Sequence, residues 1–105
     1  MKAGKIDILR ETIIDFCRKW QVVELSLFGS VLREDFGPDS DVDVLVRFAP
    51  DARVGLFDLA RMEEELERVF GRSVDLVSRR GVEASRNYLR RRQILDSSEA
   101  IYVQG

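Results

Sequence analysis

An acidic residue inside a β-branched apolar run constrains the fold of this chain more than any other feature. Residues 42–46, Val-Asp-Val-Leu-Val, are mostly of the types enriched in strands. Asp41 and Asp43 stand two positions apart, and the two-residue period of a strand directs both carboxylates to one face of a sheet. An unpaired acid in an apolar run costs free energy. The run therefore predicts a strand that carries a two-carboxylate site.

These two carboxylates have the chemistry of half a metal site. Carboxylate oxygens suit Mg²⁺ or Mn²⁺, which keep some water and take further oxygens from substrate phosphates. Upstream, Leu25–Phe28 is typical of the end of another strand, and Gly29-Ser30 follows it where a short helical turn can begin. Glycine lets a phosphate approach the backbone, and the free N–H groups of a helix start attract anions. The alternative is turn chemistry, in which Asp39 and Ser40 bond to nearby backbone.

The spacing of these groups resembles a known signature. Gly29-Ser30, ten residues and then Asp41-x-Asp43 is similar to the signature of the nucleotidyltransferase superfamily that includes the polymerase-β-like enzymes. The match extends to the tighter pattern of the minimal nucleotidyltransferase (MNT) family. In that pattern an arginine follows Gly-Ser, here Arg33. After six more residues comes Ser-Asp, here Ser40-Asp41.

The resemblance implies a role for each of these residues. A third carboxylate usually follows on a later strand, and Asp75 fits it, although an edge-strand residue facing water is the alternative. Arg33 would anchor phosphate or structure, or else pair with a neighbouring surface acid. The expected catalytic and metal-binding residues are Asp41, Asp43 and Asp75, and the expected nucleotide-binding residues are Gly29, Ser30, Arg33 and Ser40.

The resemblance also implies a function. MNT proteins commonly occur with a small all-helical HEPN partner in prokaryotic toxin-antitoxin pairs, where the HEPN protein is an RNase toxin and the transferase is its antitoxin. We therefore expect Mg²⁺-dependent transfer of AMP from ATP to a protein hydroxyl, on a tyrosine of such a toxin. Two alternatives stay open. One is a binding module that masks its partner without catalysis, and the other is an antibiotic-type enzyme that modifies a small molecule with an additional subunit.

Composition excludes several other classes of protein. The chain has no histidine, which removes imidazole bases, Ser-His triads and most zinc sites, so carboxylates must carry the chemistry. Its single cysteine, Cys17, permits no intrachain disulfide, and we expect it to be a buried, inert thiol. We see no signal peptide and no apolar run of about 18 residues, so we expect a cytoplasmic protein without a membrane segment. With a net charge of −2, direct binding to nucleic acid is not expected.

Length and periodicity predict one α/β domain over residues 1–105. Apolar residues at three- and four-residue spacing predict helices over residues 5–19, 56–70 and 83–94, the second of them ending at Gly71. Strand-type runs predict strands over 22–28, 42–48 and 74–77, with a short edge strand over 100–103. Alternation of strand and helix favours a parallel sheet, whereas the short Gly-Pro link before the second strand favours an antiparallel pair. The resemblance implies a small mixed sheet of three to four strands, which we adopt.

Two charged segments are most simply interpreted as solvated helix faces. One is Glu63–Glu65 in the second helix, and the other contains Arg86 and Arg90–Arg92 near the C-terminus. The arginines have an alternative role, which is to meet an acidic partner or a nucleotide phosphate. Whether the chain forms a homo-oligomer or a hetero-oligomer stays open.

Overall fold

The computed structural model describes residues 2–3, 6–7, 9–32, 37 and 40–104. Its elements in chain order are β1 (Lys2–Ala3), β2 (Ile6–Asp7), α1 (Arg10–Lys19), β3 (Val22–Phe28), the 3-10 helix η1 (Gly29–Leu32), β4 (Val42–Phe48), α2 (Leu56–Phe70), β5 (Val74–Ser78), α3 (Arg79–Glu83), α4 (Tyr88–Ser97) and β6 (Glu99–Val103). The strands predicted at 22–28 and 42–48 and the helix predicted at 56–70 are confirmed at both ends.

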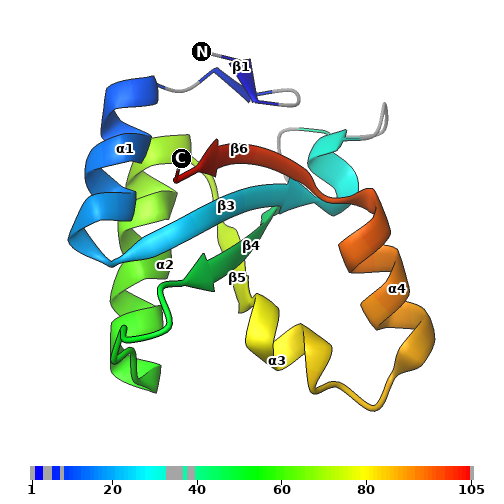
Figure 1. The fold of residues 1–105 in the computed structure, drawn as a ribbon. Helices are drawn as coiled ribbons and strands as arrows, with labels where there is room; N and C mark the ends of the chain where they lie inside the picture. The colour runs from blue at the N-terminus through cyan, green and yellow to red at the C-terminus, as the bar shows by residue number, and fades with distance from the viewer. Residues whose placement is uncertain (1, 4–5, 8, 33–36, 38–39, 105) are drawn as a thin grey trace.

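Four strands form one mixed sheet in the order β5-β4-β3-β6 (Figure 1). β3 pairs antiparallel with both β4 and β6, whereas β4 and β5 run parallel. A parallel pair needs a long crossover connection, and α2 supplies it between β4 and β5. The predicted α/β fold with a small mixed sheet is confirmed, and β6 is the predicted edge strand.

Each face of the sheet is covered by a different pair of helices. Figure 1 shows α1 and α2 together on one side and α3 and α4 on the other. Beneath α1 and α2 lies the larger core, whose buried residues include Ile13, Phe16, Met62, Leu66 and the alternating β4 residues Val42, Val44 and Val46. Beneath α3 and α4 lies a smaller core of Phe28, Leu45, Val82 and Ile94. Because side chains alternate along a strand, Asp43 shares its face with Leu45 and is directed toward α3 and α4.

The first helix is shorter than predicted. α1 begins at Arg10 and not at residue 5, and Ile6 lies in β2, which pairs antiparallel with β1. The apolar periodicity extended the prediction too far because Leu9, although in phase with Ile13, is 74% exposed and extended in conformation. An apolar residue that continues the helical spacing does not extend the helix when its side chain has no core to pack against.

The helix predicted over 83–94 corresponds to α4, which begins later, and a break over residues 84–87 separates it from α3, where a turn was predicted. α3 ends at Glu83, and α4 begins after Asn87, whose side-chain oxygen accepts a hydrogen bond of 3.1 Å from the Arg90 N–H. An asparagine in this position is a strong helix N-cap, so it starts a new helix. Arg91 Nη1 donates to the backbone oxygens of Glu83 and Ser85 across the break, at 3.2 and 3.4 Å. The apolar spacing did not reveal this break.

Two glutamates of α2 satisfy backbone groups on the open edge of the sheet. Glu67 Oε2 accepts a hydrogen bond of 3.2 Å from the Val74 N–H, and Glu63 accepts one from the Leu76 backbone. β5 is an edge strand, and uncovered edge N–H groups invite pairing with other chains. The interpretation of Glu63 as part of a solvated face is therefore wrong.

Glu65 is also misassigned as a solvated residue, because it joins α2 to the end of α1. Its carboxylate accepts hydrogen bonds from Lys19 Nζ and, at 2.9 Å, from Trp20 Nε1. Burial alone would raise the pKa of Glu65, but the two hydrogen bonds and the charge of Lys19 outweigh it and hold that pKa below its ordinary value.

Glu65→Gln is therefore expected to lower the free energy of unfolding by about 1 kcal/mol near neutral pH, because the ion pair is partly exposed. A carboxyl whose folded-state pKa is depressed stabilises the fold above its unfolded-state pKa and loses that contribution as the pH falls through the folded-state pKa. The difference between parent and variant should thus shrink below about pH 4. Urea unfolding at several pH values measures it, with the neighbouring exposed Glu64→Gln as the matched control. An equal effect of the two substitutions would contradict this role of Glu65.

Cys17 is fully buried in the larger core, as predicted. Burial raises the pKa of the Cys17 thiol to about 12, so it stays protonated and unreactive. Within the part of the chain that the structure describes, no helix has both the length and the apolar character needed to cross a membrane.

Candidate functional site

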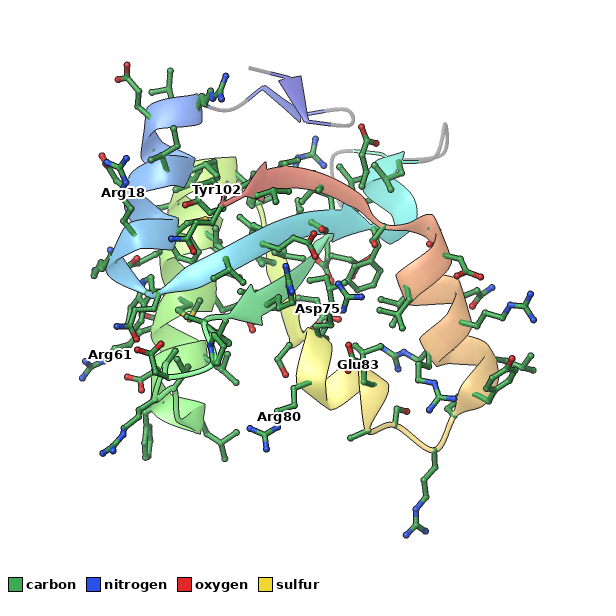
Figure 2. The ribbon with its side chains drawn as sticks, viewed as in Figure 1. Arg18, Arg61, Asp75, Arg80, Glu83 and Tyr102 are labelled. Carbon is green, nitrogen blue, oxygen red and sulfur yellow. The ribbon has the colours of Figure 1, made fainter. Side chains whose placement is uncertain are left out.

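Two of the predicted carboxylates lie opposite one another on neighbouring strands. Asp43 of β4 and Asp75 of β5 are register partners in the parallel pair, where neighbouring strands lie about 4.8 Å apart. Asp75, labelled in Figure 2, is exposed on the edge strand β5, which is the alternative that the sequence left open for it, and a ligand role stays a prediction. Asp41 is exposed and directly precedes β4, so it follows the strand period only approximately. The fold thus brings together acids from two distant segments of the sequence.

Gly29 lies directly against the carboxylate of Asp43. The residue before it, Phe28, is the register partner of Asp43 in the antiparallel pair. A Cβ atom added at Gly29 would lie 2.2 Å from Asp43 Oδ2 and 3.2 Å from Asp43 Cγ. The φ of Gly29 is also +74°, in the left-handed region that favours glycine. Close approach and backbone conformation therefore both require glycine here.

The predicted nucleotide-binding residues are placed only in part. η1 is the short helical turn expected after the strand, and it contains the backbone of Ser30. The side chain of Ser30 and the whole of Arg33 lie outside the described residues. Ser40 Oγ accepts a hydrogen bond of 3.1 Å from the Gly37 N–H, and the Ser40 N–H donates to the Gly37 oxygen at 3.1 Å. This is the turn chemistry that the sequence left open for Ser40, and a nucleotide contact from Ser40 stays a prediction.

A further carboxylate, Glu63 of α2, stands near Asp75. Burial raises the pKa of Glu63, the hydrogen bond from the Leu76 backbone opposes that shift, and the negative charges of Asp75 and Glu67 add to it. Sequence reasoning missed Glu63 at this edge of the site. The one feature of the sequence that could have indicated it is the four-residue spacing of Glu63 and Glu67, which places both on one helix face. The glutamates at 64 and 65 hide that spacing.

The acids fit a divalent ion as part of its ligand set. Carboxylates such as those of Asp41, Asp43 and Asp75 are the oxygen ligands that Mg²⁺ and Mn²⁺ prefer. Among the described residues, no group of three or more acidic, histidine or cysteine side chains is arranged to hold an ion. An ion that takes water and phosphate oxygens as further ligands needs fewer from the protein. The described carboxylates can therefore supply only part of the ligand set of such an ion.

A cavity of about 500 Å³ opens beside Gly29. Its lining comes from the end of β3, from η1 and from one face of α4, and comprises Phe28, Gly29, Leu32, Arg90, Gln93, Ile94 and Ser97. Small-molecule sites commonly have volumes of about 300–1,000 Å³. From the sequence, Arg90 was expected on a solvated helix face. The basic segment around it offered the alternative of a contact with an acidic partner or a nucleotide phosphate.

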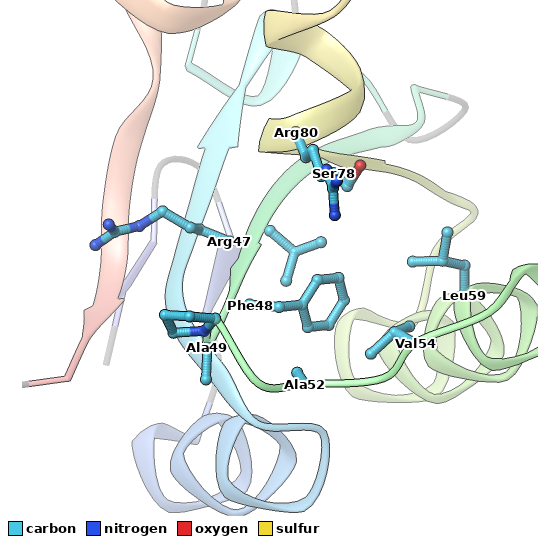
Figure 3. Close-up of a pocket in the computed structure, with 10 residues that line it drawn as sticks. Arg47, Phe48, Ala49, Ala52, Val54, Leu59, Ser78 and Arg80 are labelled. Atoms are coloured by element: carbon cyan, nitrogen blue, oxygen red, sulfur yellow. The ribbon is translucent and has the colours of Figure 1, made fainter.

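A second cavity, shown in Figure 3, lies at the other end of β4 and has a volume of about 270 Å³. Phe48, Val54 and Leu59 line it, with Arg80 reaching over it and Arg47 pointing away. Phe48 is five residues from Asp43 along the strand, or roughly 16 Å. None of the predicted site residues lines this cavity, so it is not the candidate site.

The sequence of this chain matches a known family of proteins. Residues 9–101 match the family described as nucleotidyltransferase domain. A protein of Methanocaldococcus jannaschii, described as a candidate protein adenylyltransferase, is 37% identical over 73 residues, which cover 70% of this chain and 76% of that protein.

Solved structures share the fold. A structure described as a candidate minimal nucleotidyltransferase is 36% identical, with a TM-score of 0.65 over 86% of each chain. A complex of an MNT antitoxin with a tri-AMPylated Shewanella oneidensis HEPN toxin has a chain that is 18% identical, with a TM-score of 0.60 over 90% of this chain and 70% of that one. At that identity the likeness concerns the fold alone.

Proposed function

This chain belongs to the nucleotidyltransferase domain family, and from that membership we propose that it transfers AMP from ATP to a hydroxyl of a partner protein. The observation that carries the proposal is the contact between Gly29 and Asp43, because it joins the two halves of the predicted motif. Asp43 Oδ2 lies where a side chain at Gly29 would have to stand. A phosphate that approaches the Gly29 backbone therefore meets this carboxylate and any ion bound to it.

The proposed reaction is an in-line displacement at the α-phosphorus of ATP. The acceptor oxygen forms the new bond to phosphorus, its proton leaves, and pyrophosphate departs with the electrons of the broken bond. Asp75, across from Asp43 in the register, either accepts that proton or helps to orient the acceptor. The backbone of Gly29 and Ser30 supports the outer phosphates. Asp41, Asp43 and Asp75 would hold Mg²⁺ or Mn²⁺. The ion would neutralise part of the negative charge of the triphosphate.

The proposed acceptor is a tyrosine hydroxyl of a HEPN-type toxin, so that this chain acts as its antitoxin in the cytoplasm. The similarity to a candidate protein adenylyltransferase supports a protein acceptor, and we propose the kind of partner from the Shewanella oneidensis complex, whose antitoxin shares this fold. Masking of the partner without catalysis remains the competing function, and the two differ in whether the partner gains AMP.

Label transfer from ATP tests the reaction type. With a HEPN partner and Mg²⁺ present, label at the α-phosphate should enter the partner, whereas label at the γ-phosphate should leave with pyrophosphate. Adding EDTA should stop transfer, because the carboxylates of the site repel the phosphates when no ion lies between them. It should also weaken ATP binding measured by titration calorimetry. Transfer of the γ-label would identify phosphoryl transfer and contradict the proposal, and tight ATP binding in EDTA would contradict the metal's role.

A further inference from the structure

One face of α4 forms a wall of the cavity beside Gly29. Its lining residues Arg90, Gln93, Ile94 and Ser97 follow the three- and four-residue spacing of a single helix face. Ile94 is buried against the sheet, whereas Arg90 and Gln93 are exposed to the cavity side. The cavity thus has an apolar floor, a polar wall and the Gly29 backbone at its edge.

The three consecutive arginines of α4 have different surroundings. Arg91 donates to backbone oxygens of the α3–α4 connection and lies over the Tyr88 ring, 5.3 Å from its centroid. Arg92 Nε pairs with Asp96 Oδ2 at 3.3 Å along the same helix. Arg90 has no side-chain hydrogen bond or ion pair with any residue in the described ranges. Among the three, Arg90 is the one that lines the cavity beside Gly29.

Arg90 also lines a neighbouring cavity of about 300 Å³, which extends toward Val77 and Ser78 of β5. It therefore lies between the Gly29 side of the site and the strand that carries Asp75. A triphosphate placed beside Asp43 would meet negative charge from the protein, and a cation on the opposite wall offsets it. A guanidinium suits this position, because it can donate two parallel hydrogen bonds to phosphate oxygens.

We propose that Arg90 binds an outer phosphate of the nucleoside triphosphate donor, and that the cavity between η1 and α4 is the donor's phosphate subsite. This inference rests on the proposed function and adds a binding residue from outside the Gly-Ser and Asp-x-Asp motif. In this proposal the Arg90 guanidinium contacts only the β- and γ-phosphates. A nucleotide that lacks them gains nothing from Arg90.

Titration calorimetry on the full chain with Mg²⁺ tests the proposal, with ATP and AMP as the two ligands. Arg90→Gln should weaken ATP binding by about 10- to 100-fold, as expected for the loss of charge-assisted hydrogen bonds, and should change AMP binding by less than about twofold. Arg90→Lys keeps the charge but loses the paired donors, so its ATP affinity should fall between those of the parent and Arg90→Gln. Arg92→Gln removes the same charge from the same helix and should bind ATP nearly as the parent does.

The outcomes separate this inference from the proposed function. If the parent binds ATP and Arg90→Gln binds it equally well, or if Arg92→Gln is weakened as much as Arg90→Gln, the inference is wrong and the proposed function stands. Equal weakening of ATP and AMP would also overturn the assignment to the outer phosphates. A parent that binds no nucleotide would overturn both. Circular dichroism establishes that each variant is folded, and Arg90→Lys decides the question if Arg90→Gln does not fold.

Discussion

Gly29→Ala is expected to reduce AMP transfer by on the order of a hundredfold while the protein stays folded. The added Cβ would stand 2.2 Å from Asp43 Oδ2, and the atom in its way is the far end of a side chain. The clash is therefore relieved when the Asp43 carboxylate swings away, which displaces the group that we propose as an ion ligand. A displacement of about 1 Å at a reacting centre is enough to cost about a hundredfold in rate.

Backbone strain contributes separately, and Gly71→Ala isolates it. Gly71 has a φ of +67°, close to that of Gly29, but nothing lies within 4 Å of a Cβ added there. Each substitution should cost about 1–2 kcal/mol of stability from the left-handed backbone. Only Gly29→Ala should lose transfer activity and Mg²⁺-dependent ATP binding. Parental activity in Gly29→Ala, measured beside Gly71→Ala at a temperature where both are folded, would contradict the proposed geometry.

Local sequence patterns predicted the elements that the larger core holds in place. β3, β4 and α2 have the predicted bounds because their apolar residues meet a core on the face that the periodicity indicates. The start of α1 failed for the opposite reason, since Leu9 continues the pattern but has no core to enter. Leu56 is also 84% exposed, yet α2 begins there as predicted, because the Asp58 side chain accepts a hydrogen bond of 3.0 Å from the Gly55 N–H and caps the helix.

The motif predicted which residue types form the candidate site, but it did not predict how they approach one another. That Gly29 lies against Asp43 depends on the register of β3 with β4, and that Asp75 lies beside Asp43 depends on the register of β4 with β5. Glu63 and Arg90 come from helices whose placement is fixed by tertiary packing. Runs of charged residues look the same in the sequence whatever their members do. The sequence therefore could not show that Glu65 and Arg92 form ion pairs, whereas Arg90 lines a cavity.

The second large effect is expected for Asp41→Asn combined with Asp43→Asn. Both side chains keep their size, and neither is fully buried, so the fold should persist. Loss of both charges removes carboxylate ligands of the proposed ion and the charge arrangement that stabilises the transition state. Transfer should therefore fall by at least on the order of a hundredfold. We expect contact between the two folded proteins not to depend on these charges, so the double variant should still bind the HEPN partner.

The intact mass of the partner after incubation with ATP and Mg²⁺ tests the central claim most directly. With the parent, the partner should gain the mass of AMP on a hydroxyl, and peptide mapping should place it on tyrosine. With the Asp41→Asn, Asp43→Asn variant, the partner mass should stay unchanged and growth of toxin-expressing cells should not be rescued. A partner that gains no mass with the parent, together with full rescue by the double variant, would show that this protein acts by binding alone.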